Sequence, residues 1–241
     1  MTDDSTRRPY AVVTGAAGGI GLELARQLSL HGYDVLMVAE DDDVIGAAAD
    51  LGGAGRGAAR QVDLRDFDAV ERLWEEITTA GRPVDVLALS ACAGGEGAFV
   101  ESDLLDDIDL IELNVASAVH LAKRALQAMV SRGEGRVLLT SVAARVPGRS
   151  PATSVAATAF VQTFAAAVQA EVAPHGVTVT ALLPGRTETT SSGRDGAPGG
   201  AADPAALARA GVAALMSGTG VVVAGATWTA WSASTPGSPV A

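Results

Sequence analysis

A glycine-rich segment near the start of the chain, TGAAGGIG at Thr14–Gly21, constrains the possible folds most strongly. It follows the apolar run YAVVT, Tyr10–Thr14, and opens a segment of helical length. Gly15, Gly19 and Gly21 allow a tight turn, close approach of the backbone to a pyrophosphate and close packing of a helix on a sheet. The N-terminus of that helix favours an anion. The segment therefore predicts a dinucleotide-binding turn between a strand and a helix.

An acidic residue stands at the distance from this turn that a dinucleotide site requires. Glu40 lies about twenty positions beyond Gly21, at the end of the next predicted strand. Its carboxylate can accept hydrogen bonds from the adenosine ribose and would repel a 2′-phosphate, so the sequence favours NAD over NADP. The alternative is that EDDD, residues 40–43, is a solvated acidic loop that caps the next helix.

Short apolar runs alternate with segments of helical length along the rest of the chain. This alternation predicts right-handed crossovers and a doubly wound, Rossmann-like α/β fold, with a seven-stranded parallel sheet between two layers of helices. We expect a single domain over residues 1–241, with the Gly-, Ser- and Pro-containing residues 186–203 as a loop or lid. The ligand cleft belongs at the carboxyl ends of the strands. The predicted strands are 10–14, 33–39, 57–62, 84–90, 135–141, 177–183 and 220–224.

Charge and composition limit the classes of molecule that we expect the chain to bind. The formal net charge of −11 repels phosphate backbones and anionic membrane surfaces, so we expect a small-molecule substrate and neither nucleic acid nor membrane. We identify no apolar run of membrane-spanning length and no signal-peptide stretch. The single cysteine, Cys92, excludes an internal disulfide, and the three histidines lack metal-ligand spacing. A cytoplasmic protein without a metal site is expected.

Several motifs resemble those of the short-chain dehydrogenase/reductase family, from about residue 10 to residue 183. The spacing TGxxxGIG matches, and Asn114 in ELNVAS and Ser141 in LLTSVAA match the Asn and Ser of that family's active site. The resemblance implies that Asp63 in QVDL lies beside an adenine ring and that the segment beginning LLPG frames a nicotinamide. The nucleotide-binding residues expected from the turn and from the resemblance are Thr14, Gly15, Gly19, Ile20, Gly21, Glu40, Asp63, Leu64, Ala91, Pro184, Gly185 and Thr187.

The family's remaining active-site pair, a Tyr and a Lys one helical turn later, is missing. Carrying the family's Ser-to-Tyr separation forward from Ser141 reaches Ser154, and the Lys position is Thr158. In the family the phenol is the general acid or base and the ammonium lowers its pKa, which Ser and Thr cannot reproduce. The tyrosines lie at strand beginnings, and the only lysine, Lys123, lies in another predicted helix. The candidate catalytic residues are therefore Asn114, Ser141, Ser154 and Thr158.

The segment after the fourth predicted strand also departs from the family. Where the family has Asn-Asn-Ala-Gly, this chain has Leu89, Ser90, Ala91 and Cys92. The cysteine puts a side chain where backbone normally passes close to the cofactor, and no basic residue is evidently placed to make it a nucleophile. Two alternatives follow: the chain binds NAD, or it binds no nicotinamide cofactor.

Three functional hypotheses remain. The favoured one is a non-redox enzyme that cyclises, dehydrates or isomerises a bulky natural-product-like substrate, in a cleft enlarged by the loss of Tyr and Lys and lined by neutral hydrogen-bond donors. The second is an NAD(P)-dependent ketoreductase or dehydrogenase with an atypical active site. The third is a non-catalytic partner of an active family member. In relatives the helices corresponding to 104–131 and 152–173 form the dimer interface, which implies a homodimer or homotetramer, or a heteromer with another member.

Overall fold

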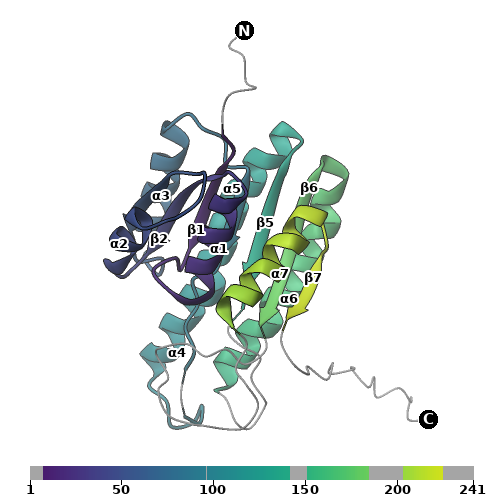
Figure 1. The fold of residues 1–241 in the computed structure, drawn as a ribbon. Helices are drawn as coiled ribbons and strands as arrows, with labels where there is room; N and C mark the ends of the chain where they lie inside the picture. Colours follow the sequence, from purple (N-terminus) through teal and green to yellow (C-terminus); the bar gives the residue numbers. More distant parts are fainter. Residues whose placement is uncertain (1–7, 96, 142–150, 185–202, 225–241) are drawn as a thin grey trace, which may run out of the picture.

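A computed structural model describes residues 8–95, 97–141, 151–184 and 203–224 (Figure 1). Within these residues seven parallel strands form one sheet in the order β3-β2-β1-β4-β5-β6-β7, which confirms the predicted doubly wound α/β fold. The strands are β1 (Tyr10–Thr14), β2 (Asp34–Ala39), β3 (Gly57–Gln61), β4 (Val86–Leu89), β5 (Gly135–Thr140), β6 (Val177–Pro184) and β7 (Val221–Ala224). The helices are α1 (Gly19–Leu30), α2 (Asp43–Ala49), α3 (Phe67–Thr79), α4 (Leu104–Ile111), η2 (Glu112–Ala116), α5 (Ser117–Arg132), α6 (Ala152–Val172), η3 (Ala173–His175) and α7 (Pro204–Ser217).

The direction of winding reverses at β1, which places a crevice at one edge of the sheet. Val12 of β1 pairs with Leu36 of β2 on one side and with Leu87 of β4 on the other. The chain winds outward from this point in both directions, so the connections after β1 and β4 diverge at their carboxyl ends. In Figure 1 these ends face the edge of the sheet beyond which α4 lies. Any ligand of this fold belongs at this edge.

Two apolar cores, one on each face of the sheet, hold the layers together. Alternate residues of each strand face opposite sides, so Val12 packs toward one core while Ala11 and Val13 pack toward the other. The first core includes residues of α3, α5 and α6, and the second includes residues of α1, α2 and α7. Because both faces are covered, the inner strands are buried along their length, as parallel sheets require.

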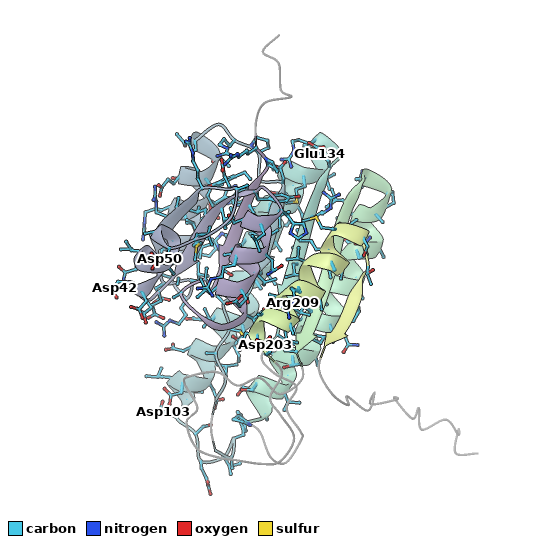
Figure 2. The ribbon with its side chains drawn as sticks, viewed as in Figure 1. Asp42, Asp50, Asp103, Glu134, Asp203 and Arg209 are labelled. Atoms are coloured by element: carbon cyan, nitrogen blue, oxygen red, sulfur yellow. The ribbon has the colours of Figure 1, made fainter. Side chains whose placement is uncertain are left out.

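Aspartates begin several of the helices and fix where they start. Asp66 accepts hydrogen bonds from backbone N–H groups in the first turn of α3, and Asp103 and Asp203 do the same for α4 and α7 (Figure 2). Asp203 is the last residue of the predicted lid, and it belongs to the start of α7. Residues 186–202 of that predicted lid lie outside the described residues.

The helix expected over residues 104–131 is interrupted. It consists of α4, a π-helical turn η2 that contains Asn114, and α5. A π-helical turn accommodates one extra residue in a helix and frequently occurs at functional sites. The sequence pattern predicted the helix but not this turn, because the apolar spacing on either side is helical.

Helix α6 corrects one expectation from the sequence. The segment Ala152–His175 is long and apolar enough, by length and composition, to cross a membrane. It nevertheless packs along β6, and Ala157, Val161 and Ala165 are buried in the first core. Only 22% of its most apolar 18-residue window is buried, so α6 packs on the sheet along one side and leaves most of its residues at least partly exposed.

Candidate active site

The glycine turn has the geometry that close backbone contact demands. Gly15 has a φ of +65°, and a Cβ atom there would lie 2.7 Å from the backbone O of Ser90 and from the backbone N of Ala91. Gly19 has a φ of +55°, and a Cβ there would meet nothing within 4 Å. The backbone directly after β4 therefore excludes a side chain at position 15. At position 19, by contrast, there is open space at the start of α1. This space is where a phosphate group would approach.

Thr14 joins this turn to the segment after β4. Its Oγ1 atom accepts hydrogen bonds from the backbone N of Ser90 at 3.0 Å and from that of Ala91 at 3.1 Å. Thr14 is almost fully buried. The hydroxyl thus fixes the spacing between the ends of β1 and β4, which form the two walls of the crevice. The sequence identified Thr14 and Ala91 as nucleotide-binding residues but gave no sign of this contact between them.

The start of α1 is suited to bind a pyrophosphate. The first N–H groups of a helix have no partner within the helix. The N-cap of α1 is Gly18, which has no side chain to occupy them, and no acidic residue lies in the first turn. Ile20 packs against the second core and Gly21 is buried, so both anchor the helix. The backbone from Gly15 to Gly21 therefore fits the phosphates of a dinucleotide.

At the expected adenosine end, an arginine links the predicted acidic residues. The guanidinium of Arg65 donates to both oxygens of Asp63, from Nε at 2.9 Å and from Nη2 at 3.0 Å, and also forms an ion pair with Glu40. A longer contact of 3.5 Å reaches Asp109 on α4. The hydrogen bonds from Arg65 lower the pKa of Asp63, and the carboxylates raise the pKa of Arg65. Leu64, between the two, is buried in the first core.

Arg65 is a site residue that the sequence did not indicate. The motif QVDLRD shows it two positions after Asp63, where it is the one basic side chain, but nothing in the spacing indicates that Glu40 and Asp109 meet it. These contacts join residues 25 and 44 positions apart. Only the fold brings them together.

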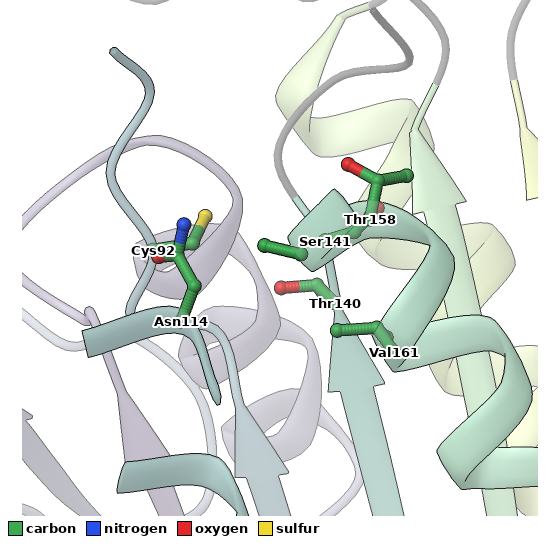
Figure 3. A pocket seen from close by; sticks show the side chains of 7 residues that line it. Cys92, Asn114, Thr140, Ser141, Thr158 and Val161 are labelled. Carbon is green, nitrogen blue, oxygen red and sulfur yellow. The ribbon is translucent and has the colours of Figure 1, made fainter. Parts of the chain in front are cut away.

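Three of the four expected catalytic residues, Asn114, Ser141 and Thr158, line a small pocket at the carboxyl edge of the sheet (Figure 3). Cys92 and Asn114 lie on one side of it, and Ser141, Thr140 and Thr158 lie across from them. The empty space is about 180 Å³ including its open mouth, and the enclosed part has room for about one water molecule. The pocket-lining residues are Cys92, Asn114, Thr140, Ser141, Ala157, Thr158 and Val161.

Asn114 is held in this pocket by the loop after β4. Its Oδ1 atom accepts from the backbone N of Ala93, and its Nδ2 atom donates to the backbone O of Ala93, each at 2.8 Å. The side chain is buried at 6% exposure. The amide therefore fixes the loop that carries Cys92 and has one N–H left to donate toward the pocket.

Ser154 lies outside the pocket lining. It is fully buried, and its Oγ atom accepts a hydrogen bond of 3.0 Å from the backbone N of Gly95. A Cβ on Gly95 would meet Pro151 at 3.3 Å and Leu110 at 3.5 Å, so this loop packs closely against the start of α6. In the described part of the chain, loop backbone thus occupies the surroundings of the serine, and the cleft is not visibly enlarged there.

Thr158 does face the pocket, one helical turn after Ser154. Its Oγ1 atom donates to the backbone O of Ser154 at 3.0 Å, within the helix. This local bond occupies the hydroxyl proton, so the threonine presents oxygen lone pairs and a methyl group rather than a charge. Thr140, which the sequence did not single out, donates to Ser90 Oγ at 3.0 Å beneath the same pocket.

Cys92 is a poor nucleophile in this setting. The residue has exposed atoms, but its side chain lines the pocket, and desolvation raises the pKa of the thiol to about 11. Within the described residues, the side chains that line the pocket with Cys92 are neutral.

The chain's tyrosines and its lysine lie elsewhere. Tyr10 begins β1, at the opposite edge of the sheet, with the Arg82 guanidinium 4.5 Å above its ring. The Tyr33 hydroxyl faces the sulfur of Met216 on α7. Lys123 is exposed on α5. Pro184 is buried at the end of β6, while Gly185 and Thr187 lie outside the described residues.

Comparison with protein families gives one assignment. The profile of the family described as short chain dehydrogenase matches residues 9–197 of the chain. The chain is similar to the 3-oxoacyl-(acyl-carrier-protein) reductase FabG of Escherichia coli, with 30% identity over 181 residues that cover 74% of this chain and 73% of the relative. It is also similar to the very-long-chain 3-oxoacyl-CoA reductase of Mycosarcoma maydis, with 34% identity over 74% of this chain and 53% of the relative.

Solved structures agree with this assignment. A short-chain dehydrogenase from Sphingobium yanoikuyae in complex with NADPH superimposes with a TM-score of 0.80 and 26% sequence identity, over 89% of this chain and 87% of the other. A bulky-bulky ketone specific alcohol dehydrogenase from Comamonas testosteroni superimposes with a TM-score of 0.78 over 90% of this chain and 86% of the other. At 24% identity, the latter likeness concerns the fold alone.

Proposed function

The chain belongs to the short-chain dehydrogenase family, and on that premise we propose that it is an NAD(P)-dependent oxidoreductase of the ketoreductase type with an atypical active site. The observation that carries the proposal is the complete phosphate-binding turn, with Gly15 against β4, open space at Gly19 and the free N-terminus of α1. A chain that had abandoned nucleotides would have no need to keep this turn unfilled. The named activities of its relatives point to ketones and 3-oxoacyl groups as substrates.

The pocket supplies hydrogen bonds rather than a charged proton donor. A bound NAD(P)H supplies the hydride that reduces a substrate carbonyl. In this proposal Ser141 and Asn114, which both line the pocket, orient the carbonyl oxygen and stabilise the negative charge that develops on it. Thr158 stands where the family has a lysine and adds no charge. Asn114 and Ser141 are therefore the proposed catalytic pair, with Thr158 as a pocket wall.

Proton delivery limits the rate in this proposal. The substrate alkoxide needs one proton, and neither a serine hydroxyl nor the Cys92 thiol, with its raised pKa, is matched to that task near neutral pH. The enclosed pocket has room for about one water molecule, which can carry the proton from solvent. Turnover is therefore expected to be slower by a factor of about 10² to 10⁴ than that of relatives with the Tyr and Lys.

The favoured cofactor is NAD, because the Glu40 carboxylate would repel a 2′-phosphate. The remaining parts of the proposal are a cytoplasmic protein that acts on a small molecule and assembles with a second copy, or with another family member, through α5 and α6. Exposed small residues on α6, such as Ala156 and Ala159, suit close helix packing. The net charge of −11 favours neither nucleic acid nor a membrane surface as a partner.

A non-redox enzyme is the second candidate, and one observation favours it. The hydrogen bond from Gly95 to Ser154 packs loop backbone against the residue at which the resemblance places the family's tyrosine, so this position is occupied without a phenol. The same neutral donors, Asn114 and Ser141, would then stabilise charge in a cyclisation, dehydration or isomerisation of a bulky substrate. A non-catalytic role beside an active relative has no such observation in its favour.

Two measurements distinguish the oxidoreductase from the non-redox enzyme. Calorimetric titration of the cofactor-free protein with NADH and NADPH tests the turn, and mass spectrometry then measures deuterium transfer from 4-deuterated NADH to a panel of 3-oxoacyl thioesters and bulky ketones. Isotope transfer detects turnover too slow for absorbance assays. The oxidoreductase proposal requires nucleotide binding and a deuterated alcohol that disappears in Ser141→Ala. Binding without any transfer would refute it in favour of the non-redox candidate.

A further inference from the structure

The Arg65 guanidinium occupies a position that bears on the choice of cofactor. It spans the ends of β2 and β3 by contacting Glu40 and Asp63, at the edge of the crevice where the adenosine ribose is expected. About 29% of the Arg65 side chain is exposed, compared with 59% for Glu40. The arginine is therefore partly enclosed by the carboxylates, whereas Glu40 lies on the solvent side.

The N–H groups of Arg65 differ in the hydrogen bonds that they make. Nε and one N–H of Nη2 hold both oxygens of Asp63, in the paired geometry that makes arginine–carboxylate contacts strong. The second N–H of Nη2 points to Glu40. Nη1 has only the 3.5 Å contact with Asp109. Removing Glu40 would free the Nη2 donor that it occupies, while Asp63 still held the guanidinium in place.

Free arginine donors at this point match a known requirement. In dinucleotide-binding folds an acidic residue favours NAD, whereas a nearby arginine accommodates the 2′-phosphate of NADP. This chain has both residue types in one ion pair. Arginine is well suited to phosphate because its planar group donates two parallel hydrogen bonds.

We propose that Arg65 is a specificity-determining residue whose 2′-phosphate-binding edge is masked by Glu40. NADPH must displace the Glu40 carboxylate from the guanidinium, whereas NADH needs only the carboxylate oxygen that Arg65 leaves free. Glu40 thus disfavours NADPH in two ways. Its carboxylate repels the 2′-phosphate, and it also pairs with the Arg65 guanidinium that would otherwise bind that phosphate. This inference rests on the proposed nucleotide binding and goes beyond it by naming a cation that binds the 2′-phosphate.

A double-mutant cycle tests the masking. Dissociation constants for NADH, NADPH and the half-ligand adenosine 2′,5′-bisphosphate are measured by calorimetry in the wild type, Glu40→Gln, Arg65→Gln and the double variant. In Glu40→Gln we expect NADPH and the bisphosphate to bind about tenfold or more tightly than in the wild type. In the double variant most of that gain should be lost, because the cation that the phosphate would contact is gone and only the relief of repulsion from the Glu40 charge remains. Higher salt should reduce the gain, as expected for a charged contact near solvent.

A matched control distinguishes this contact from general charge. Arg60 on β3 forms a comparable exposed ion pair with Glu76 on α3, with an Nε–Oε1 distance of 2.6 Å. Glu76→Gln also removes one negative charge and should change NADPH affinity by less than about twofold. Equal gains in Glu40→Gln and in the double variant would overturn the proposed role of Arg65 while leaving nucleotide binding intact. No binding of NADH to the wild type would overturn both this inference and the proposed function.

Discussion

Replacing Thr14 with valine tests whether its hydroxyl holds the two walls of the crevice together. Valine has nearly the same shape, so the change removes the oxygen that accepts from the backbone of Ser90 and Ala91 with little change in packing. The N–H of Ser90 is in a buried residue and would lose its partner, whereas Ala91 is partly exposed and can turn to water. An unsatisfied buried donor costs about 1–3 kcal/mol and a lost exposed bond about 0.5–1.5 kcal/mol, so we expect destabilisation of about 2–4 kcal/mol.

The assay is urea denaturation followed by circular dichroism, with Thr180→Val as the control. Thr180 is also fully buried in a strand, but within the described residues its hydroxyl makes one hydrogen bond, a donation of 2.8 Å to the backbone O of Thr219. That change should cost about 1 kcal/mol. The Thr14 variant should also bind NADH more weakly, whereas the Thr180 variant should not. If Thr14→Val costs no more than Thr180→Val, the reasoning that one oxygen supports both backbone groups is wrong.

Three further results follow from the site and the helix surface. Cys92 should react slowly with iodoacetamide at pH 8, because a thiol pKa of about 11 leaves only about a thousandth of the thiol ionised. The labelling rate should rise about tenfold per pH unit, and fast labelling at pH 8 would contradict the raised pKa. Ser154→Tyr combined with Thr158→Lys should increase deuterium transfer from NADH. It should also lower the free energy of unfolding by about 1–3 kcal/mol, since the phenol must displace the loop at Gly95. Unchanged transfer would mean that proton delivery is not limiting. Ala159→Glu on the exposed side of α6 should shift the protein toward monomer in analytical ultracentrifugation, and an unchanged assembly would place the interface elsewhere.

The sheet and the glycine turn were predictable because their signals are local. An apolar run such as YAVVT encodes a buried strand by itself, and the spacing from Thr14 to Gly21 encodes the turn that follows it. The position of Glu40 at the end of β2 follows from counting residues. Each of these expectations depends on neighbours within one strand, turn and helix unit.

The contacts that shape the site were not predictable, because they join distant parts of the chain. Thr14 meets Ser90 across 76 positions, and Gly95 meets Ser154 across 59. The resemblance implies that Ser154 stands at the position of the missing tyrosine, but the absence of a side chain does not reveal what packs against that position. Here the filling group is backbone, which has no signature in residue type.

The apolar stretch that becomes α6 shows the same dependence on the folded chain. Gln162 and Thr163 interrupt its apolar residues, so the sequence shows no continuous apolar run of membrane-spanning length there. Once the helix forms as one continuous element, Ala152–His175 satisfies the length and hydropathy of a membrane span although it packs on β6.

The π-helical turn at residues 112–116 keeps the buried sides of α4 and α5 aligned. An extra residue in a regular α-helix would turn every later side chain by about 100° around the axis, whereas the wider π-helical turn accommodates that residue locally. Leu110 on α4 and Leu121 on α5 are accordingly both buried, although the turn lies between them. Losing one residue within the turn would convert it to an α-helical turn and leave the core-facing side of α5 toward the sheet, whereas inserting a second residue there would rotate that side away.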